Sequence, residues 1–317
     1  MDRQQLLRHQ INNFAQSALL LAGMVGLLAL LAWIVAGPGA ILWTLLGAGL
    51  VLLFAPQVSP RLILKLYGAR PIAPTEMPEL HAATVELARR AALPRPPRLY
   101  YLPTKAMNAF TLGRRDDAAV TLTDGLMRRL DEPEIVAILA HEIAHARHND
   151  MWIMNLADSV SRLTRILAMV GWFMLLLNLA AIMMRYGTLP WLAIVILMIS
   201  PTASALLQLA LSRTREFDAD LGAAELIGDP RALARALDKL ERLQGNPWER
   251  VLMPGRRLPD PSLLRTHPRT EERIARLLAL ELPERPPPMP RYGALGAPAH
   301  WPAIQHPPRQ RWTGLWH

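Results

Sequence analysis

The chain has no cysteine among its 317 residues. This absence excludes disulfide bonds and every metal site built on thiolate ligands, and it says little about the compartment. Aromatic residues are sparse at 6%, whereas hydrophobic residues as a class make up 51%, which is high for a soluble protein. The length allows one or two domains with a real core.

Charge is missing from four long stretches of the chain. These stretches are residues 15–36, 40–54, 166–184 and 189–211. The first would extend about 33 Å as a helix, enough to cross a bilayer, whereas the second is shorter and must borrow flanking residues. A signal peptide competes for the first stretch and buried core helices for the last two, but length and lack of charge favour membrane spans. The pattern predicts two transmembrane hairpins.

Basic residues flank these stretches unevenly and give the chain a formal net charge of +9. They gather on the outer sides of the two hairpins, at Arg3, Arg8, Arg61, Lys65, Arg70, Arg162, Arg165, Arg213 and Arg215. The short loops inside the hairpins contain only Arg185. The positive-inside rule then places both termini and the region between the hairpins in the cytoplasm, with the lipid bilayer as partner. The charge needs no nucleic-acid partner, and no motif of such proteins is present.

A small mixed domain is expected between the hairpins. An amphipathic helix is predicted at residues 78–92, and short strands at 99–102, 109–112 and 118–122. A further helix begins at Asp131, which would serve as N-cap, with a proline and a glutamate following at the positions typical of a helix start. This helix carries His141 and His145.

The spacing of His141 and His145 predicts a metal site. Residues i and i+4 lie on one face of a helix, so both imidazoles can bind one ion, and zinc accepts neutral imidazole. Glu142 lies beside the pair, where it would be the general base on the attacking water. The alternative is a helix whose histidines fall this way by chance, so the site needs a third ligand. His148 is too far along the helix to join the ion, and we interpret it as a solvated residue of the helix end.

The third ligand must come from elsewhere in the chain. Glu216 and Asp220 are the best candidates, because a Glu ligand and an Asp that holds the other nitrogen of a ligand histidine would complete the site. Polar residues also recur at four-residue steps towards them, at Ser200, Ser204, Gln208 and Ser212. This favours one helix that continues from the fourth span, although an ordinary solvated helix remains an alternative. Glu225 and Asp218 are weaker candidates for the ligand.

These pieces together resemble the HtpX-like membrane zinc endopeptidases, relatives of the CAAX prenyl protease. The resemblance rests on the two hairpins, Asn108-Ala109-Phe110, the HExxH sequence at 141–145 followed by Asn149-Asp150-Met151, the sequence at 212–220, and Thr266-His267-Pro268 followed by Glu272-Arg273-Ile274. It covers about residues 1–280. The family more often has Asn-Gly-Asp where this chain has His148-Asn149-Asp150, a modest departure.

The resemblance implies a fold, a site and a role. Zinc would be held by His141, His145 and Glu216, with Glu142 as base and Asp220 supporting a ligand. Asn108, Ala109 and Phe110 would bind an extended substrate, and His267 and Arg273 would stabilise the oxyanion. The implied role is quality control in the bacterial cytoplasmic (inner) membrane, with misfolded or damaged membrane proteins or unfolded segments as substrates. The oligomeric state stays open.

The expected fold is α+β, mainly α, an integral membrane protein with four transmembrane helices and a cytoplasmic zincin-like catalytic domain with a small β-sheet. Its expected parts are an N-terminal transmembrane hairpin (1–60), the catalytic domain with the HExxH helix (61–165), a second hairpin (166–211), the third-ligand helix with the rest of the catalytic domain (212–282) and a Pro-rich, disordered tail (283–317).

Three other functions compete with broad quality control. A specific protease could process prenylated or signal-type peptides at the same site. A membrane chaperone or scaffold could keep a vestigial zinc site without activity. A transporter or channel would place ionisable groups inside its spans, and the four stretches contain none. Manganese or cobalt could replace zinc, because availability as well as affinity decides which metal is bound.

Overall fold

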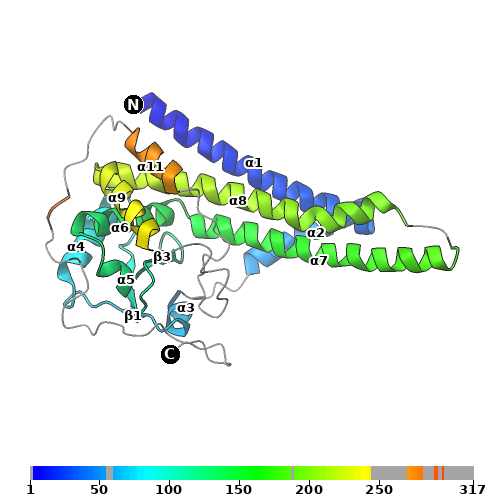
Figure 1. The fold of residues 1–317 in the computed structure, drawn as a ribbon, viewed down its shortest axis with the longest axis horizontal. Helices are drawn as coiled ribbons and strands as arrows, with labels where there is room; N and C mark the ends of the chain where they lie inside the picture. Colours follow the sequence, from blue (N-terminus) through cyan, green and yellow to red (C-terminus); the bar gives the residue numbers. More distant parts are fainter. Residues whose placement is uncertain are drawn as a thin grey trace. The chain divides into compact units, whose positions relative to one another are not determined.

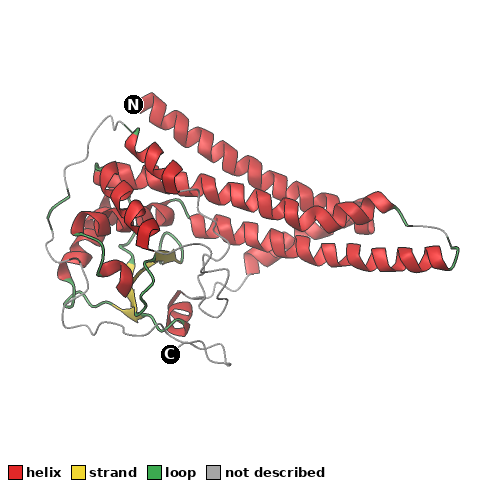
Figure 2. Cartoon of the chain, viewed as in Figure 1, coloured by secondary structure: helices red, strands yellow, loops and turns green. Residues whose placement is uncertain are grey.

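The computed structural model describes residues 3–54, 60–186, 189–243, 270–280, 289–291 and 295. Contacts divide these residues into two compact units. The first contains the described residues within 1–10, 58–151 and 215–317, and the second those within 11–57 and 152–214. Figure 2 shows one small sheet in an otherwise helical chain. His267 and nearly all of the predicted Pro-rich tail lie outside the described residues.

Long helices make up the second unit. They are α1 (Arg3–Ala36), α2 (Pro38–Phe54), α7 (Asp150–Met183) and α8 (Trp191–Ile227), and all but α2 have residues at one end that belong to the first unit. Among the described residues, three segments are long and apolar enough to cross a membrane: Asn12–Ala36, Asp150–Met183 and Trp191–Ile227. Helix α2 has 17 residues, fewer than a typical span of about 20. The predicted spans at 15–36, 166–184 and 189–211 are therefore supported, and the span at 40–54 stays a prediction.

Helices α7 and α8 lie side by side (Figure 1) and contact each other through both apolar and polar groups. Gly171 of α7 faces Leu197 of α8 so closely that a Cβ added to the glycine would lie 2.7 Å from the leucine Cβ. Ser161 lies 3.0 Å from the Ser204 hydroxyl and donates to Gln208 Oε1 at 2.8 Å. Small residues and buried polar side chains hold helices together in lipid, where apolar burial gives no preference.

A mixed four-stranded sheet organises the first unit. Its order is β1-β2-β4-β3, with β1 (Arg70–Pro71), β2 (Arg98–Leu102), β3 (Ala109–Leu112) and β4 (Ala119–Thr123). Strands β2 and β4 are parallel, whereas β1 and β3 pair antiparallel to them as the two edges. The three predicted strands are confirmed to within one residue at each end, and β1 was not predicted.

Helices pack against this sheet and against one another, and they supply most of the core. They are α3 (Pro60–Leu66), α4 (Pro78–Arg90), α5 (Asp124–Met127), α6 (Glu132–Arg147), α9 (Pro230–Leu243) and α11 (Thr270–Leu278). Helix α6 begins with the predicted capping box between Asp131 and Glu134, and Lys239 of α9 donates to both carboxylates. Residues Ile135, Leu139 and Ile143 are fully buried in the core, which fixes α6 in place.

Helix α8 brings its acidic residues against α6. The polar residues that recur at four-residue steps from Ser200 to Asp220 lie on one unbroken helix, and all six are buried. Farther along α8, Gly222 meets Ala144 of α6, where an added Cβ would lie 3.0 Å from the alanine Cβ. This close approach of two small residues allows longer side chains of α8 to reach the histidines.

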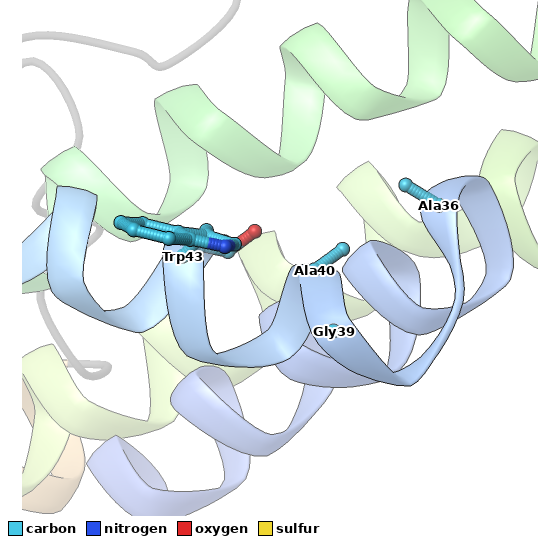
Figure 3. Close-up of a pocket in the computed structure, with 5 residues that line it drawn as sticks. Ala36, Gly39, Ala40 and Trp43 are labelled. Carbon is cyan, nitrogen blue, oxygen red and sulfur yellow. The ribbon is translucent and has the colours of Figure 1, made fainter.

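The hollow in Figure 3 lies at the turn between α1 and α2. It is lined by Ala36, Gly39, Ala40, Trp43 and Thr44. None of these side chains ionises in the ordinary range of pH or binds a metal well, so the hollow offers no chemistry. The described residues that could hold a metal ion, His141, His145 and Glu216, lie in the first unit.

We predict that Gly171→Ala destabilises the protein, because the new methyl group cannot fit between α7 and α8. Overpacking of this kind costs about 1–3 kcal/mol. Gly26→Ala in α1 is the matched control, since nothing lies within 4 Å of a Cβ added there. It should be neutral or slightly stabilising, because alanine favours a helix over glycine. The midpoint of thermal unfolding in detergent measures both, and equal midpoints for the two variants would contradict the close packing.

Candidate metal centre

Helix α6 carries two buried histidines that point one nitrogen each at a common place. His141 Nε2 and His145 Nε2 are 3.1 Å apart, and the two residues are 6% and 3% exposed. One turn of helix separates the residues, so their imidazoles meet on one face.

Glu216 of α8 completes the group. Its Oε2 lies 3.6 Å from His141 Nε2, and its Oε1 lies 3.8 Å from His145 Nε2. Ligand atoms bound about 2.0–2.1 Å from a tetrahedral zinc ion lie roughly 3.3 Å from each other, so the observed spacing suits a single ion. Within the described residues, His141, His145 and Glu216 are the group with donor atoms close enough to hold a metal.

The other nitrogen of each histidine faces a carboxylate. His141 Nδ1 lies 3.1 Å from Asp220 Oδ1, and His145 Nδ1 lies 2.7 Å from Asp150 Oδ2. His141 Nδ1 lies near Asp220 but makes no well-directed hydrogen bond. Because an ionised carboxylate only accepts hydrogen bonds, His145 Nδ1 carries the hydrogen, and its Nε2 keeps its lone pair for a metal. This is the arrangement usual for histidine ligands in metal sites.

Arg273 of α11 is buried against the same carboxylates. Its Nε and Nη2 donate to the two oxygens of Asp220 at 2.7 and 2.6 Å, and its Nη1 lies 3.2 Å from Glu216 Oε2. Burial alone would lower the pKa of Arg273, but Asp220 and Glu216 outweigh it and raise that pKa. The guanidinium therefore stays charged and fixes Asp220 behind His141.

The acidic surroundings favour a positive charge at His141. Burial lowers the pKa of His141, but the neighbouring carboxylates of Asp220 and Glu216 outweigh burial and raise it to about 9. The carboxylates that favour a charged His141 would also attract a metal cation to the space between His141, His145 and Glu216. The donor set, its spacing and its electrostatics all fit a divalent metal ion.

Glu142 lies beside this group and is held by the sheet. Thr111 of β3 donates to Glu142 Oε2 at 2.8 Å and also lies 3.1 Å from the Glu142 carbonyl oxygen. Both residues are buried, with exposed fractions of 7% and 5%. The hydroxyl group fixes one carboxylate oxygen of Glu142.

The predicted substrate strand lies at the edge of the sheet. Strand β3 contains Ala109 and Phe110, and its one neighbour in the described sheet is β4. Asn108 precedes it, donating its N–H to Thr123 Oγ1 at 2.9 Å and accepting from that hydroxyl at 2.8 Å. The Phe110 side chain packs in an apolar cluster with Leu64.

Two weaker ligand candidates lie apart from the group. Asp218 accepts from Arg215 at 2.8 Å, and Glu225 lies 3.9 Å from Arg147. The interpretation of His148 as a solvated residue was wrong. His148 does end α6, but it is half-buried beside Gly222, and its Nδ1 has no hydrogen-bond partner.

The sequence did not predict three parts of this centre: the contact of Thr111 with Glu142, the support of His145 by Asp150, and the contact of Arg215 with Asp150. A weak signal existed for Asp150, an acidic residue at the start of a helix five positions after His145. Neither Thr111 nor Arg215 has a pattern that predicts its partner, because both contacts join segments far apart in the chain.

Comparison with known proteins gives a family and several relatives. The pattern of peptidase family M48 matches residues 74–281. A "Protease HtpX homolog" of Methylibium petroleiphilum is 33% identical over 295 residues, which cover 86% of this chain and 99% of the relative. One from Acaryochloris marina is 38% identical over 286 residues, covering 84% and 91%. The crystal structure of S. mikatae Ste24p is 20% identical with a TM-score of 0.47, covering 85% of this chain and 66% of that one. The resemblance predicted from the sequence is confirmed.

We predict that His148 makes the fold sensitive to acid. Burial lowers its pKa from 6.5 to about 4, so the unfolded chain binds more protons than the folded chain between these values. The free energy of unfolding should therefore be highest above pH 6.5 and fall as the pH drops towards 4, by at most about 3 kcal/mol from this residue. His148→Asn should lose less stability over that range.

Denaturant titrations at pH 7 and pH 4.5 measure this difference. A chelator in every sample removes any contribution from metal release. Equal losses of stability in the wild type and His148→Asn would contradict the prediction.

Proposed function

Because the chain belongs to peptidase family M48, and is therefore a metalloprotease of a bacterial membrane, we propose that it is a zinc endopeptidase for membrane-protein quality control. The observation that carries the proposal is the convergence of His141, His145 and Glu216 on one place, with Glu142 held beside it. Two imidazoles and one carboxylate are a common set for a catalytic zinc, which keeps one position open.

Zinc would be held by His141, His145 and Glu216. When bound, it would polarise the carbonyl of the scissile peptide and acidify the attacking water. Asp220 and Asp150 would hold the two imidazoles in the tautomer that binds metal, and Arg273 would keep Asp220 in place.

Glu142 would move the proton. One of its oxygens accepts from Thr111, which leaves the other to take a proton from the attacking water. The same carboxyl group would then deliver that proton to the leaving amine. His267 and Arg273 are proposed to stabilise the oxyanion, in the case of Arg273 together with its contacts to Asp220 and Glu216.

The substrate would be an extended peptide segment. Strand β3 is an edge strand, and such an edge can hydrogen-bond the backbone of a peptide irrespective of its sequence. Asn108, Ala109 and Phe110 would be the residues along that edge. Recognition through the backbone suits an enzyme that removes misfolded or damaged membrane proteins, which expose segments of many sequences.

The site is proposed to face the cytoplasm from the bacterial inner membrane. The support is the asymmetry of basic residues, which flank the hairpins and leave the short loops with Arg185 alone. Both termini and the metal centre would lie on that side, with α2 as the fourth span. A role in the response to membrane stress follows from the same activity.

Glu142→Gln tests the catalytic base. The wild type in detergent, stripped by chelator, should cleave an unfolded protein only after zinc is returned. Glu142→Gln should bind one zinc ion as the wild type does and cleave at least about 100-fold more slowly, because the amide cannot take a proton. Glu241→Gln, at an exposed position on α9, is the matched control and should keep full activity. Cleavage by Glu142→Gln at the wild-type rate would overturn the mechanism.

Zinc itself should stabilise the fold through Glu216. A ligand that binds only the folded state adds about 2.7 kcal/mol at a concentration 100 times its dissociation constant, so zinc should raise the midpoint of thermal unfolding of the stripped wild type. Glu216→Gln removes one donor and should reduce that rise. The same rise in both proteins would exclude Glu216 as a ligand.

A further inference from the structure

We propose that Asp150 and Arg215 are positioning residues that hold His145 for metal binding as one coupled pair. The inference rests on the proposed metal site, since it concerns how one of its ligands is held. It adds to the support that His141 receives from Asp220 and Arg273, because His145 is held by different residues, Asp150 of α7 and Arg215 of α8.

The pair forms part of a continuous chain of charged hydrogen bonds. His145 Nδ1 donates to Asp150 Oδ2 at 2.7 Å, and Arg215 Nε donates to Asp150 Oδ1 at 2.6 Å. Arg215 also donates from Nη1 to Asp218 Oδ2 at 2.8 Å. Each oxygen of Asp150 therefore has its own donor, so the carboxylate cannot rotate without losing both bonds.

Both residues of the pair are buried. Asp150 is 0% exposed and Arg215 is 6% exposed, so water cannot replace the hydrogen-bond partner of either residue. A buried carboxylate needs a compensating positive charge, and Arg215 is a cation bonded directly to Asp150. Asp150 is also the first residue of the long helix α7, where the helix dipole favours a negative charge.

The chemistry of the imidazole defines what the pair does. Asp150 keeps the hydrogen of His145 on Nδ1, and this leaves the lone pair of Nε2 directed towards Glu216 and His141. Arg215 sets the plane of the carboxylate and so the plane of the imidazole. Since Arg215 precedes Glu216 in the chain, one turn of α8 supplies both the third ligand and the support for the second.

The test is a double-mutant cycle on metal affinity. Asp150→Asn and Arg215→Met should each raise the zinc dissociation constant about 10–100-fold, as loss of such supporting contacts does elsewhere. The double variant should be no more than about twofold weaker than the weaker single, because both residues act through one contact to His145. Competition with a chromophoric chelator measures the constants, and the absorption spectrum of bound cobalt reports ligand geometry.

Asp124→Asn is the matched control. Asp124 is a carboxylate at 3% exposure that accepts from Tyr101 Oη at 2.8 Å and from Arg128 Nε at 2.8 Å, outside the metal centre. It should lose stability and keep the wild-type zinc affinity and cobalt spectrum. An altered cobalt spectrum in Asp150→Asn, absent in Asp124→Asn, separates positioning from a general loss of stability.

Two results would overturn the inference alone, and a third would overturn the proposed metal site as well. Wild-type zinc affinity and cobalt spectrum in Asp150→Asn would exclude a role in positioning. Effects of the two single variants that multiply in the double variant would exclude the coupled pair. Failure of the wild type itself to bind zinc would instead overturn the proposed metal site, and with it this inference.

Discussion

The burial of acidic groups beside two imidazoles is the constraint on which this centre depends. Asp150, Asp218, Asp220 and Glu216 are all buried in the first unit, and each charge costs several kcal/mol in desolvation unless it is compensated. Arg215 and Arg273 compensate two of these charges through hydrogen bonds. Two negative charges remain, which a divalent cation would balance, and Glu142 is then the further carboxylate left for proton transfer. The same charges that hold the ligands thus make the place selective for a cation.

Helix α8 explains how so many charged groups reach one place. A helix presents residues four apart on one face, so Glu216 and Asp220 follow one another along the side that meets α6. The approach is close because Gly222 and Ala144 have small side chains where the helices touch. Larger residues there would push Glu216 away from the histidines, so the packing of two small residues determines whether the third ligand reaches the site.

Local signals in the sequence predicted much of this arrangement. The capping box, three strands, the HExxH helix and the polar stripe of α8 each depend on residues within a few positions of each other. The sequence could not reveal contacts such as Thr111 with Glu142 or Arg215 with Asp150, because they join residues 31 and 65 positions apart. The burial of His148 was missed for the same reason, since Gly222 of a distant helix covers it. The short strand β1 has too few residues for any alternating pattern.

The turn between α6 and α7 brings Asp150 to His145 through one unusual backbone conformation. Asp150 lies against His145 although α6 ends only three residues earlier, at Arg147, so the chain has to change direction over His148 and Asn149. Asn149 does this with a φ of +54°, a left-handed conformation that asparagine tolerates better than most residues. Its Oδ1 also accepts from the Arg115 N–H at 3.1 Å, a bond that a glycine at this position could not make. Asn149 therefore keeps the backbone geometry that positions Asp150 and adds a hydrogen bond to the turn after β3.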